Sequence, residues 1–237
     1  MFDTSRTTEV LREMQSYKLH ILGVSEYRWT GFGQLTTGTG ETILYSGRKD
    51  DQHMAGVALI LKKGLKKALI EWQPVNESLI RARFNGKHTK LSIIQCYAPT
   101  SDADDEDKDA FSRRLQEEVD KVTFHDVLCV MGDMNAKVGD NNTNRERVMG
   151  NHWCGDLNDI GERFSDFCLE NRLIIGGTLF PHKTTHQLTW LSPNGKVENQ
   201  IDHLLVNQKW CRSLFNVRAC RGATVRPPSC EGCTKVI

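Results

Sequence analysis

Acidic, amide and phenolic side chains close or interrupt several apolar, strand-like segments of this chain. These side chains are Glu26, Tyr97, Asp133, Asn135 and Asp202. A single buried acid is usually a hydrogen-bonded structural group, but the same placement on four segments is harder to explain by structure alone. Carboxylates gather in one site only when a cation or a shared proton relieves their repulsion.

The oxygen atoms of these side chains suit a hard metal ion. Carboxylates with an amide and a phenol, and no cysteine pair among them, favour Mg²⁺ or Mn²⁺. Such an ion polarises a phosphoryl oxygen and screens the charge of a phosphodiester under attack. Asp133 could orient or deprotonate the attacking water, while Asn135 and Tyr97 could donate hydrogen bonds to the phosphate. The residues therefore predict metal-dependent phosphodiester chemistry.

Hydrophobic periodicity predicts the elements that must position these side chains. Helices are expected over residues 7–17, 106–122 and 160–172. The segments with strand-like patterns are 20–26, 42–47, 56–63, 67–72, 78–84, 90–99, 125–133, 173–178, 187–193, 197–206 and 213–222. Pro193, Asn194 and Gly195 are predicted to turn one strand into the next as a hairpin. Short strands with interspersed helices predict an α/β fold of two mixed sheets packed face to face, with helices outside.

Composition and motifs exclude several classes of protein. The chain has 237 residues, 38% hydrophobic and 26% charged, which suits one large domain or two small ones. Its net charge of +1 argues neither for nor against nucleic acid. Neither a Gly-x-Gly-x-x-Gly motif nor a P-loop is present, which disfavours nucleotide-cofactor and kinase-like functions.

Hydropathy and cysteine content predict an intracellular protein, nuclear or cytoplasmic. No apolar run approaches the roughly 18 residues of a membrane span, and MFDTSRTTEV has no apolar signal core. We expect most of the eight cysteines to be reduced core residues. Cys230 and Cys233 form a metal-like pair, with Cys220, or His152 and Cys154, as further ligand candidates. Zinc is disfavoured because no second clean pair stands at zinc-ribbon spacing.

The ordered motifs ILGVSE, CYAP, VMGDMN, LTW and QIDHLLV resemble those of the endonuclease/exonuclease/phosphatase superfamily. SEYRWTGFG, GDMNAKVG, LENRLIIGGTLF and TWLSPNGKVENQIDHLLV are similar to one subgroup within it. That subgroup holds the apurinic-type endonuclease domains of LINE-like retrotransposons and the craniofacial development protein 2-like proteins. The resemblance runs from about residue 7 to about residue 225.

This resemblance implies a four-layer α/β sandwich that cleaves a phosphodiester, typically in DNA, with a divalent metal. Glu26 would be the metal ligand and Tyr97 would contact the phosphate. Asp133 would act on the water or the leaving group, and Asn135 would stabilise the transition state. Asp202 would orient a catalytic histidine.

Three further residues are implied as substrate contacts, each with an alternative role. Thr189 and Trp190 would line the site, although a core aromatic is the more ordinary role for Trp190. Arg28 would meet a phosphate, and a simple surface role is the alternative. The cluster Lys62, Lys63, Lys66 and Lys67 is interpreted as a solvated turn.

The chain departs from the family pattern at both ends. The resemblance implies a first strand with a metal-holding Asn, which has no counterpart before MFDTSRTTEV, and a final Ser-Asp-His with a core strand. TVRPPSCEGCTKVI contains no Asp-His, and its two prolines oppose a strand. We therefore predict an N-terminally truncated domain over 1–225, a divergent tail over 226–237, and a missing or altered last strand.

These departures leave the activity open between three alternatives. His203 follows Asp202, but strand alternation points it to the opposite face, whereas His182 and His186 remain candidates. The first hypothesis is a DNA endonuclease with weak or no activity, because loss of one catalytic group costs orders of magnitude in rate. The alternative is a catalytically dead domain that acts as a binding or interaction module. A phosphatase or lipid phosphodiesterase of the same superfamily is the third and least favoured.

Overall fold

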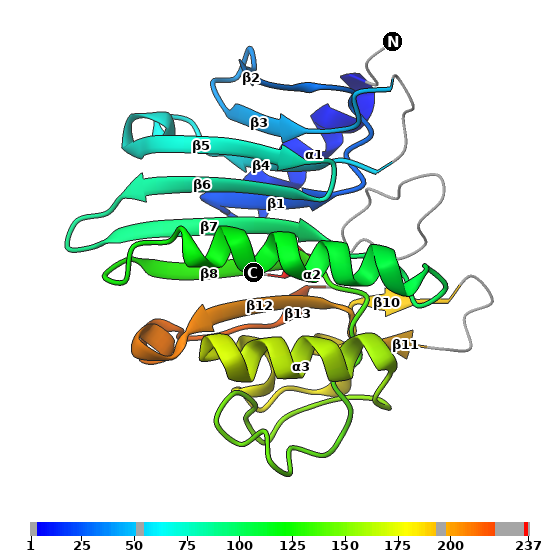
Figure 1. Cartoon of the computed structure of the whole chain (residues 1–237). Helices are drawn as coiled ribbons and strands as arrows, with labels where there is room; N and C mark the ends of the chain where they lie inside the picture. Colours follow the sequence, from blue (N-terminus) through cyan, green and yellow to red (C-terminus); the bar gives the residue numbers. More distant parts are fainter. Residues whose placement is uncertain (1–3, 51–54, 193–197, 221–234, 237) are drawn as a thin grey trace. The chain divides into compact units, whose positions relative to one another are not determined.

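The computed structural model describes residues 4–50, 55–192, 198–220 and 235–236 and shows a mixed α/β fold (Figure 1). The chain forms two compact units. Unit 1 comprises Met1–Ala98 and Asp104–Gly132, and unit 2 comprises Pro99–Ala103 and Asp133–Ile237. Among the described helices, none is long and apolar enough to cross a bilayer.

The first sheet of unit 1 is antiparallel and is covered by the N-terminal helix. Its strands are β1 (Ile21–Ser25), β2 (Phe32–Thr36), β3 (Thr42–Ser46) and β4 (Val57–Leu61), in the order β1-β4-β3-β2. Helix α1 (Thr4–Ser16) packs Leu11 and Met14 against Ile43, Ala58 and Ile60. Because side chains alternate along a strand, Leu44, Leu59 and Leu61 point to the other face.

That other face packs on a second set of strands in unit 1. The turn η1 (Leu65–Ala68) leads into β5 (Leu69–Asn76), followed by β6 (Leu79–Asn85), β7 (Lys90–Tyr97) and β8 (Val127–Asp133), adjacent in that order. Ile80, Ala82 and Ile93 join Leu44 and Leu59 in one buried cluster. The two sheets of unit 1 therefore face each other across an apolar core, as predicted.

Helix α2 (Asp105–Asp120) covers the outer face of the second set of strands. Arg81 of β6 donates from Nε to Glu118 Oε2 at 2.8 Å, and Arg83 donates from Nε to Asp126 Oδ2 at 2.7 Å. These arginines alternate with the apolar residues of β6, so they point away from the core. Unit 1 thus has four layers, in the order α1, sheet, sheet, α2.

Unit 2 contains one longer helix and several short strands. Its elements are α3 (Asp159–Asn171), β9 (Leu173–Ile175), η2 (Gly176–Thr178), η3 (Thr184–His186), β10 (Trp190–Leu191), β11 (Glu198–Asn199), β12 (Asp202–Asn207), η4 (Gln208–Ser213), β13 (Ala219–Cys220) and β14 (Lys235–Val236). Antiparallel pairs form between β12 and β9, β10 and β11, and β13 and β14.

Most predicted elements are present, and the differences follow from local turns. The segment 197–206 divides into β11 and β12, and within the described part of 213–222 the strand is Ala219–Cys220, since the 3₁₀ turn Gln208–Ser213 and an irregular stretch precede it. Strand β2 was not predicted, since FGQLT has little apolar pattern. The predicted 193–195 turn lies outside the described residues, as does the predicted tail except for 235–236.

Candidate active site

The chain bends sharply where β1 ends at the predicted metal ligand. Glu26 and Arg28 adopt left-handed backbone conformations, with φ of 55° and 52°. Such angles are uncommon for residues other than glycine and persist only where the surroundings hold them. Here Tyr27 N donates to Gly56 O and Arg28 N donates to Ala55 O, each at 2.9 Å. The bend therefore belongs to the fold of unit 1.

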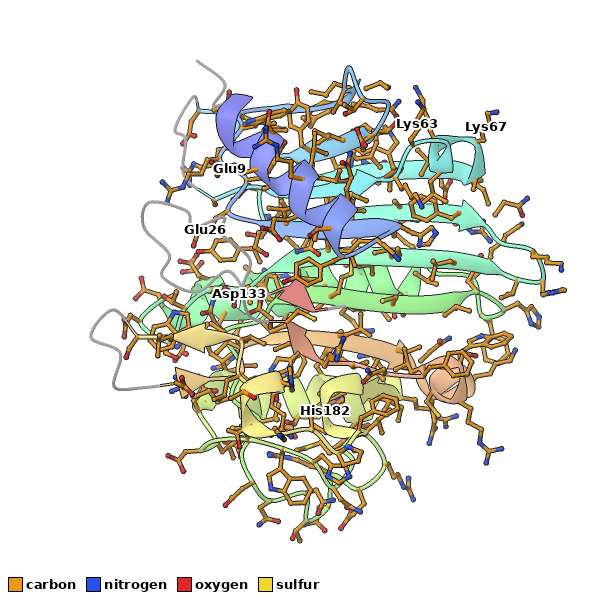
Figure 2. All side chains as sticks on the ribbon, turned by 180° about the vertical axis from the view of Figure 1, so that it is seen from behind. Glu9, Glu26, Lys63, Lys67, Asp133 and His182 are labelled. Atoms are coloured by element: carbon orange, nitrogen blue, oxygen red, sulfur yellow. The ribbon has the colours of Figure 1, made fainter. Side chains whose placement is uncertain are left out.

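Tyr97 and Arg28 both contact the carboxylate of Glu26. Tyr97 Oη donates to Glu26 Oε1 at 2.8 Å, and Arg28 Nη2 lies 3.4 Å from Glu26 Oε2. The side chain of Glu26 is 14% exposed and that of Arg28 is 34% exposed, so the group borders solvent. Ser25 Oγ donates to Cys96 O at 3.1 Å, which ties the ends of β1 and β7 together. Three predicted site residues thus form one hydrogen-bonded group, called here the Glu26 group (Glu26 is labelled in Figure 2).

Gly132 determines how the chain reaches Asp133. It has a φ of 138°, and a Cβ atom at this position would lie 2.0 Å from Cys96 O. Only glycine fits such a conformation and such a close backbone approach. The glycine in VMGDMN is thus required by packing within unit 1.

Asp133 begins a tight turn in unit 2 that orients Asn135. Asp133 Oδ1 accepts a hydrogen bond from Asn135 N at 3.0 Å, which forms an Asx-turn. Asn135 is left-handed, with a φ of 49°. Asn is one of the residues that tolerate this conformation most readily. The acid and the amide are therefore fixed relative to each other by the backbone between them.

Asn158 holds this turn and was not predicted as a site residue. Its Nδ2 donates to Asn135 O at 3.1 Å, and its Oδ1 accepts from Lys137 N at 2.9 Å. The same Oδ1 accepts from Gly161 N at 2.7 Å and so caps helix α3. The signal in the sequence was an Asn just before an amphipathic segment, which is a preferred N-cap.

Asp202 shares its surroundings with Asp133 and Thr189 in unit 2. Thr189 is buried, and its Oγ1 accepts from Ile201 N at 2.9 Å and from Asp202 N at 3.1 Å. Burial raises the pKa of Asp202 well above its usual range, and the charge of Asp133 raises it further, although a hydrogen bond to Thr189 opposes this. Two carboxylates near each other in a poorly hydrated place favour one proton or one cation between them. The structure therefore brings Asp133, Thr189 and Asp202 into one electrostatic group, called here the Asp133 group.

His203 faces away from the Asp133 group, as strand alternation predicts. Its Nε2 donates to Ala136 O at 2.8 Å, and its ring lies 5.0 Å from the ring of Phe164. Burial lowers the pKa of His203 to about 4, although the bond to Ala136 opposes this. His203 is thus a neutral packed side chain near pH 7.

The other candidate residues have more ordinary surroundings. Trp190 is half-buried on the short strand β10, where it pairs with Asn199. His182 Nε2 lies 2.7 Å from Asn216 Oδ1, and His186 Nδ1 lies 3.2 Å from Ala219 O. These contacts connect neither histidine ring to a predicted catalytic residue.

The side chains at these positions fit Mg²⁺ in chemistry but do not form a complete cage. Among the described residues, no three His, Cys, Asp or Glu side chains come together in a metal-binding group. Mg²⁺ commonly takes one or two carboxylates and completes its shell with water and substrate phosphate. The carboxylate of Glu26, at the border with solvent, meets that requirement.

The chain is similar in sequence to a known protein family and to curated proteins. The model of the endonuclease/exonuclease/phosphatase family matches residues 2–223. Craniofacial development protein 2 of Bos taurus is 36% identical over 214 residues, which are 90% of this chain and 36% of that protein. The chain therefore spans about a third of the length of the curated relatives it matches.

Two solved structures share the fold at low sequence identity. The 3′ phosphatase NExo from Neisseria, bound to product DNA hairpin, has a TM-score of 0.71 and 18% identity, covering 98% of this chain and 93% of that one. The endonuclease domain of TRAS1, a telomere-specific non-LTR retrotransposon, has a TM-score of 0.65 and 13% identity, covering 98% and 90%. These likenesses confirm the predicted fold class.

Proposed function

Because the chain belongs to the endonuclease/exonuclease/phosphatase family, we propose that it is a metal-dependent phosphodiesterase of the DNA endonuclease type. The names of two fold neighbours, a DNA-bound 3′ phosphatase and a retrotransposon endonuclease domain, support DNA as the substrate class. The second of these names also supports descent from a retrotransposon endonuclease. The observation that carries the proposal is the Asp133 group, where Asp202 N donates to Thr189 and where burial, and then the charge of Asp133, raise the pKa of Asp202.

Glu26 is the proposed ligand of Mg²⁺ or Mn²⁺. The bound ion would polarise a phosphoryl oxygen and screen the charge of the phosphodiester. Tyr97 holds one oxygen of the Glu26 carboxylate, so it orients the ligand and presents a phenol next to it. Arg28 lies beside the other oxygen and is one-third exposed, which suits a contact with a substrate phosphate.

Asp133 and Asn135 are proposed to act on the reacting groups. The carboxylate of Asp133 would orient the attacking water and accept its proton as the water oxygen bonds to phosphorus. The bond between phosphorus and the leaving oxygen then breaks, and that oxygen takes up a proton from solvent water. The amide of Asn135 would donate to a phosphoryl oxygen that gains charge in the transition state.

Asp202 is proposed to be a positioning residue that would orient a catalytic histidine. His203 is not that histidine. The ring of His203 is committed to Ala136 O and packs on Phe164. We therefore propose that hydrolysis by this 237-residue chain is weak.

The same observation favours a second candidate, a binding module without catalysis. Because His203 is buried and neutral, it cannot pair with Asp202 or transfer a proton in the reaction. The Glu26 group would then bind a metal and a phosphate without cleavage.

Cleavage of supercoiled, nicked and abasic DNA by the purified chain tests the proposal. We expect slow cleavage in Mg²⁺, none in EDTA, and a further loss of about 100-fold or more in Asp133→Ala. Asp140→Ala is the matched control, because Asp140 is an exposed acid on the same loop. Rapid cleavage that depends on Asp133 would show that the predicted weakness is wrong.

Calorimetry separates the two candidates. Mg²⁺ binding that Glu26→Gln abolishes, together with DNA binding and no measurable cleavage, would support the binding module. If neither Mg²⁺ binding nor cleavage is detected, the phosphodiesterase proposal fails.

A further inference from the structure

The strand ends of unit 1 opposite the Glu26 group carry a concentration of lysine. Lys62, Lys63, Lys66 and Lys67 lie on the turn between β4 and β5, and Lys87 and Lys90 lie on the hairpin between β6 and β7. All six side chains are exposed. This set is called here the basic end. Figure 2 shows Lys63 and Lys67 at one end of the unit 1 strands and Glu26 at the other.

Backbone contacts bring these two turns together. Lys62 N donates to His20 O at 2.9 Å, which places the end of β4 beside the start of β1. Leu69 pairs with Phe84, so the turn before β5 adjoins the hairpin after β6. Strand β7 then runs from Lys90 to Tyr97, and its 8 residues span about 26 Å. The basic end is therefore well separated from the Glu26 group within unit 1.

Two buried acidic side chains near the basic end are already engaged within the fold. Glu118 accepts from Arg81 at 2.8 Å and from Lys121 at 2.6 Å, and Asp126 accepts from Arg83 at 2.7 Å. The negative charges of Glu118 and Asp126 are therefore balanced by these arginine and lysine partners.

Two other acids at this end are also engaged. Glu71 pairs with Arg81 at 3.3 Å. Glu41 is buried and accepts hydrogen bonds from Thr37, Thr39 and Gln15. Exposed acids remain near this end at Glu71 and, in the last turn of α2, at Glu117 and Asp120, but the six ammonium groups outnumber them.

Acidic residues concentrate at the other end of unit 1. The first turn of α2 contains Asp105, Glu106 and Asp107, all exposed, and the contacts of Arg81 and Arg83 place the end of α2 toward the basic end. The helix therefore begins near the strand ends that carry the Glu26 group. The net charge of the chain is only +1, although unlike charges concentrate at opposite ends of unit 1. This separation of charge would orient an approaching polyanion.

We propose that the basic end binds the phosphate backbone of nucleic acid as a second contact, separate from the Glu26 group. Lysine ammonium groups recognise phosphates as point charges without reading bases. A lipid surface would also need apolar anchors, but the large exposed apolar side chains near this end, among the described residues, are Ile70 after the turn and Phe124, which precedes the His125 that Thr89 contacts. The choice of nucleic acid over an acidic protein rests on the proposed function.

Fluorescence anisotropy with a labelled 30-base-pair duplex in EDTA tests this contact without catalysis. The variant neutralises four positions at once: Lys62→Ala, Lys63→Ala, Lys66→Ala and Lys67→Ala. We expect its Kd to rise at least about tenfold and the slope of log K against log salt to fall by about 2 or more. The matching Lys→Arg variant should bind like the wild type.

The matched control removes four exposed charges elsewhere: Lys49→Ala, Lys183→Ala, Lys209→Ala and Arg212→Ala. If both neutralised variants lose affinity equally, or if the wild type does not bind the duplex at low salt, the proposal is wrong. Binding to phosphatidylserine vesicles but not to DNA would assign the basic end to a membrane instead. Because binding is read in EDTA, a loss here is distinguishable from failed cleavage, which would contradict only the proposed function.

Discussion

Asp202 is half-buried and Glu41 is buried, and their surroundings shift the pKa values of these two acids in opposite directions. Burial raises the pKa of each, and at Asp202 the charge of Asp133 adds to this effect. At Glu41 hydrogen bonds from Thr39, Thr37 and Gln15 outweigh burial and lower the pKa to about 2. Glu41 is therefore a structural acceptor in the turn between β2 and β3, whereas the surroundings of Asp202 disfavour its ionised form. Such strain is typical of functional sites.

We expect Asp202→Asn to stabilise the protein near neutral pH. A carboxyl whose pKa is raised on folding contributes stability below its ordinary pKa and loses it as pH rises through the folded value. Asn removes the charge but can still contact Thr189, so the free energy of unfolding at pH 7 should rise by about 0.5–2 kcal/mol. Urea denaturation at pH 4 and pH 7 measures this effect. An equal or lower stability at pH 7 would contradict the repulsion between Asp133 and Asp202.

The turn after Asp133 and the first turn of α3 depend on each other through Asn158. Its side chain caps α3 at Gly161 and satisfies Lys137 N and Asn135 O. Gly161 is required in this arrangement, because a Cβ atom there would lie 1.8 Å from Lys137 O. The helix therefore fixes the backbone that presents Asn135, although 23 residues separate Asn158 from it.

We expect Asn158→Ala to destabilise the protein by about 1–2 kcal/mol, since it removes a helix cap and leaves backbone groups unpaired. Hydrogen exchange at the Lys137 and Gly161 amides should become faster, and urea denaturation should show the lower stability. Asn158→Asp is the control, because it keeps the oxygen acceptor and should retain most protection at both amides. If Ala and Asp exchange alike, the capping role is wrong.

At the scale of the whole molecule, the acids with lowered pKa values among the described residues lie in unit 1. Besides Glu41, they include Glu118 and Asp126, where burial opposes ionisation but hydrogen bonds and charges from Lys121, Arg81 and Arg83 outweigh it. A carboxyl whose pKa is lowered on folding contributes stability above its ordinary pKa and loses it as pH falls. Unit 1 is therefore expected to be sensitive to acid.

We expect Glu41→Gln to lower stability at pH 7 by about 2–3 kcal/mol and to have little effect near pH 2. The wild type should lose this contribution as pH falls from about 4.5 to about 2. Thermal denaturation across this range measures the difference between the two proteins. A difference that does not depend on pH would show that the carboxylate charge at Glu41 is not the cause. Exposed Glu9→Gln serves as the control and should match the wild type.

Patterns local in sequence predicted the longer elements and the strand-end position of the candidate site residues. Helix α3 was expected at 160–172 and spans Asp159–Asn171, and β7 was expected at 90–99 and spans Lys90–Tyr97. Strands of two or three residues were poorly bounded, because so few side chains leave little periodicity to read. The lysine turn is exposed to solvent, as predicted, whereas its proposed role in binding was not anticipated from the sequence.

The sequence by itself determined which chemical groups are present and, through the twofold alternation of a strand, that His203 and Asp202 point to opposite faces. Only the tertiary structure decided which partners these groups meet. Tyr97 reaches Glu26 across 71 residues, and Asn158 was not identified until its contacts with Asn135 and Lys137 were seen. The physical reason is that side-chain direction follows from the local backbone period, whereas contacts between distant segments depend on how strands align and how turns close.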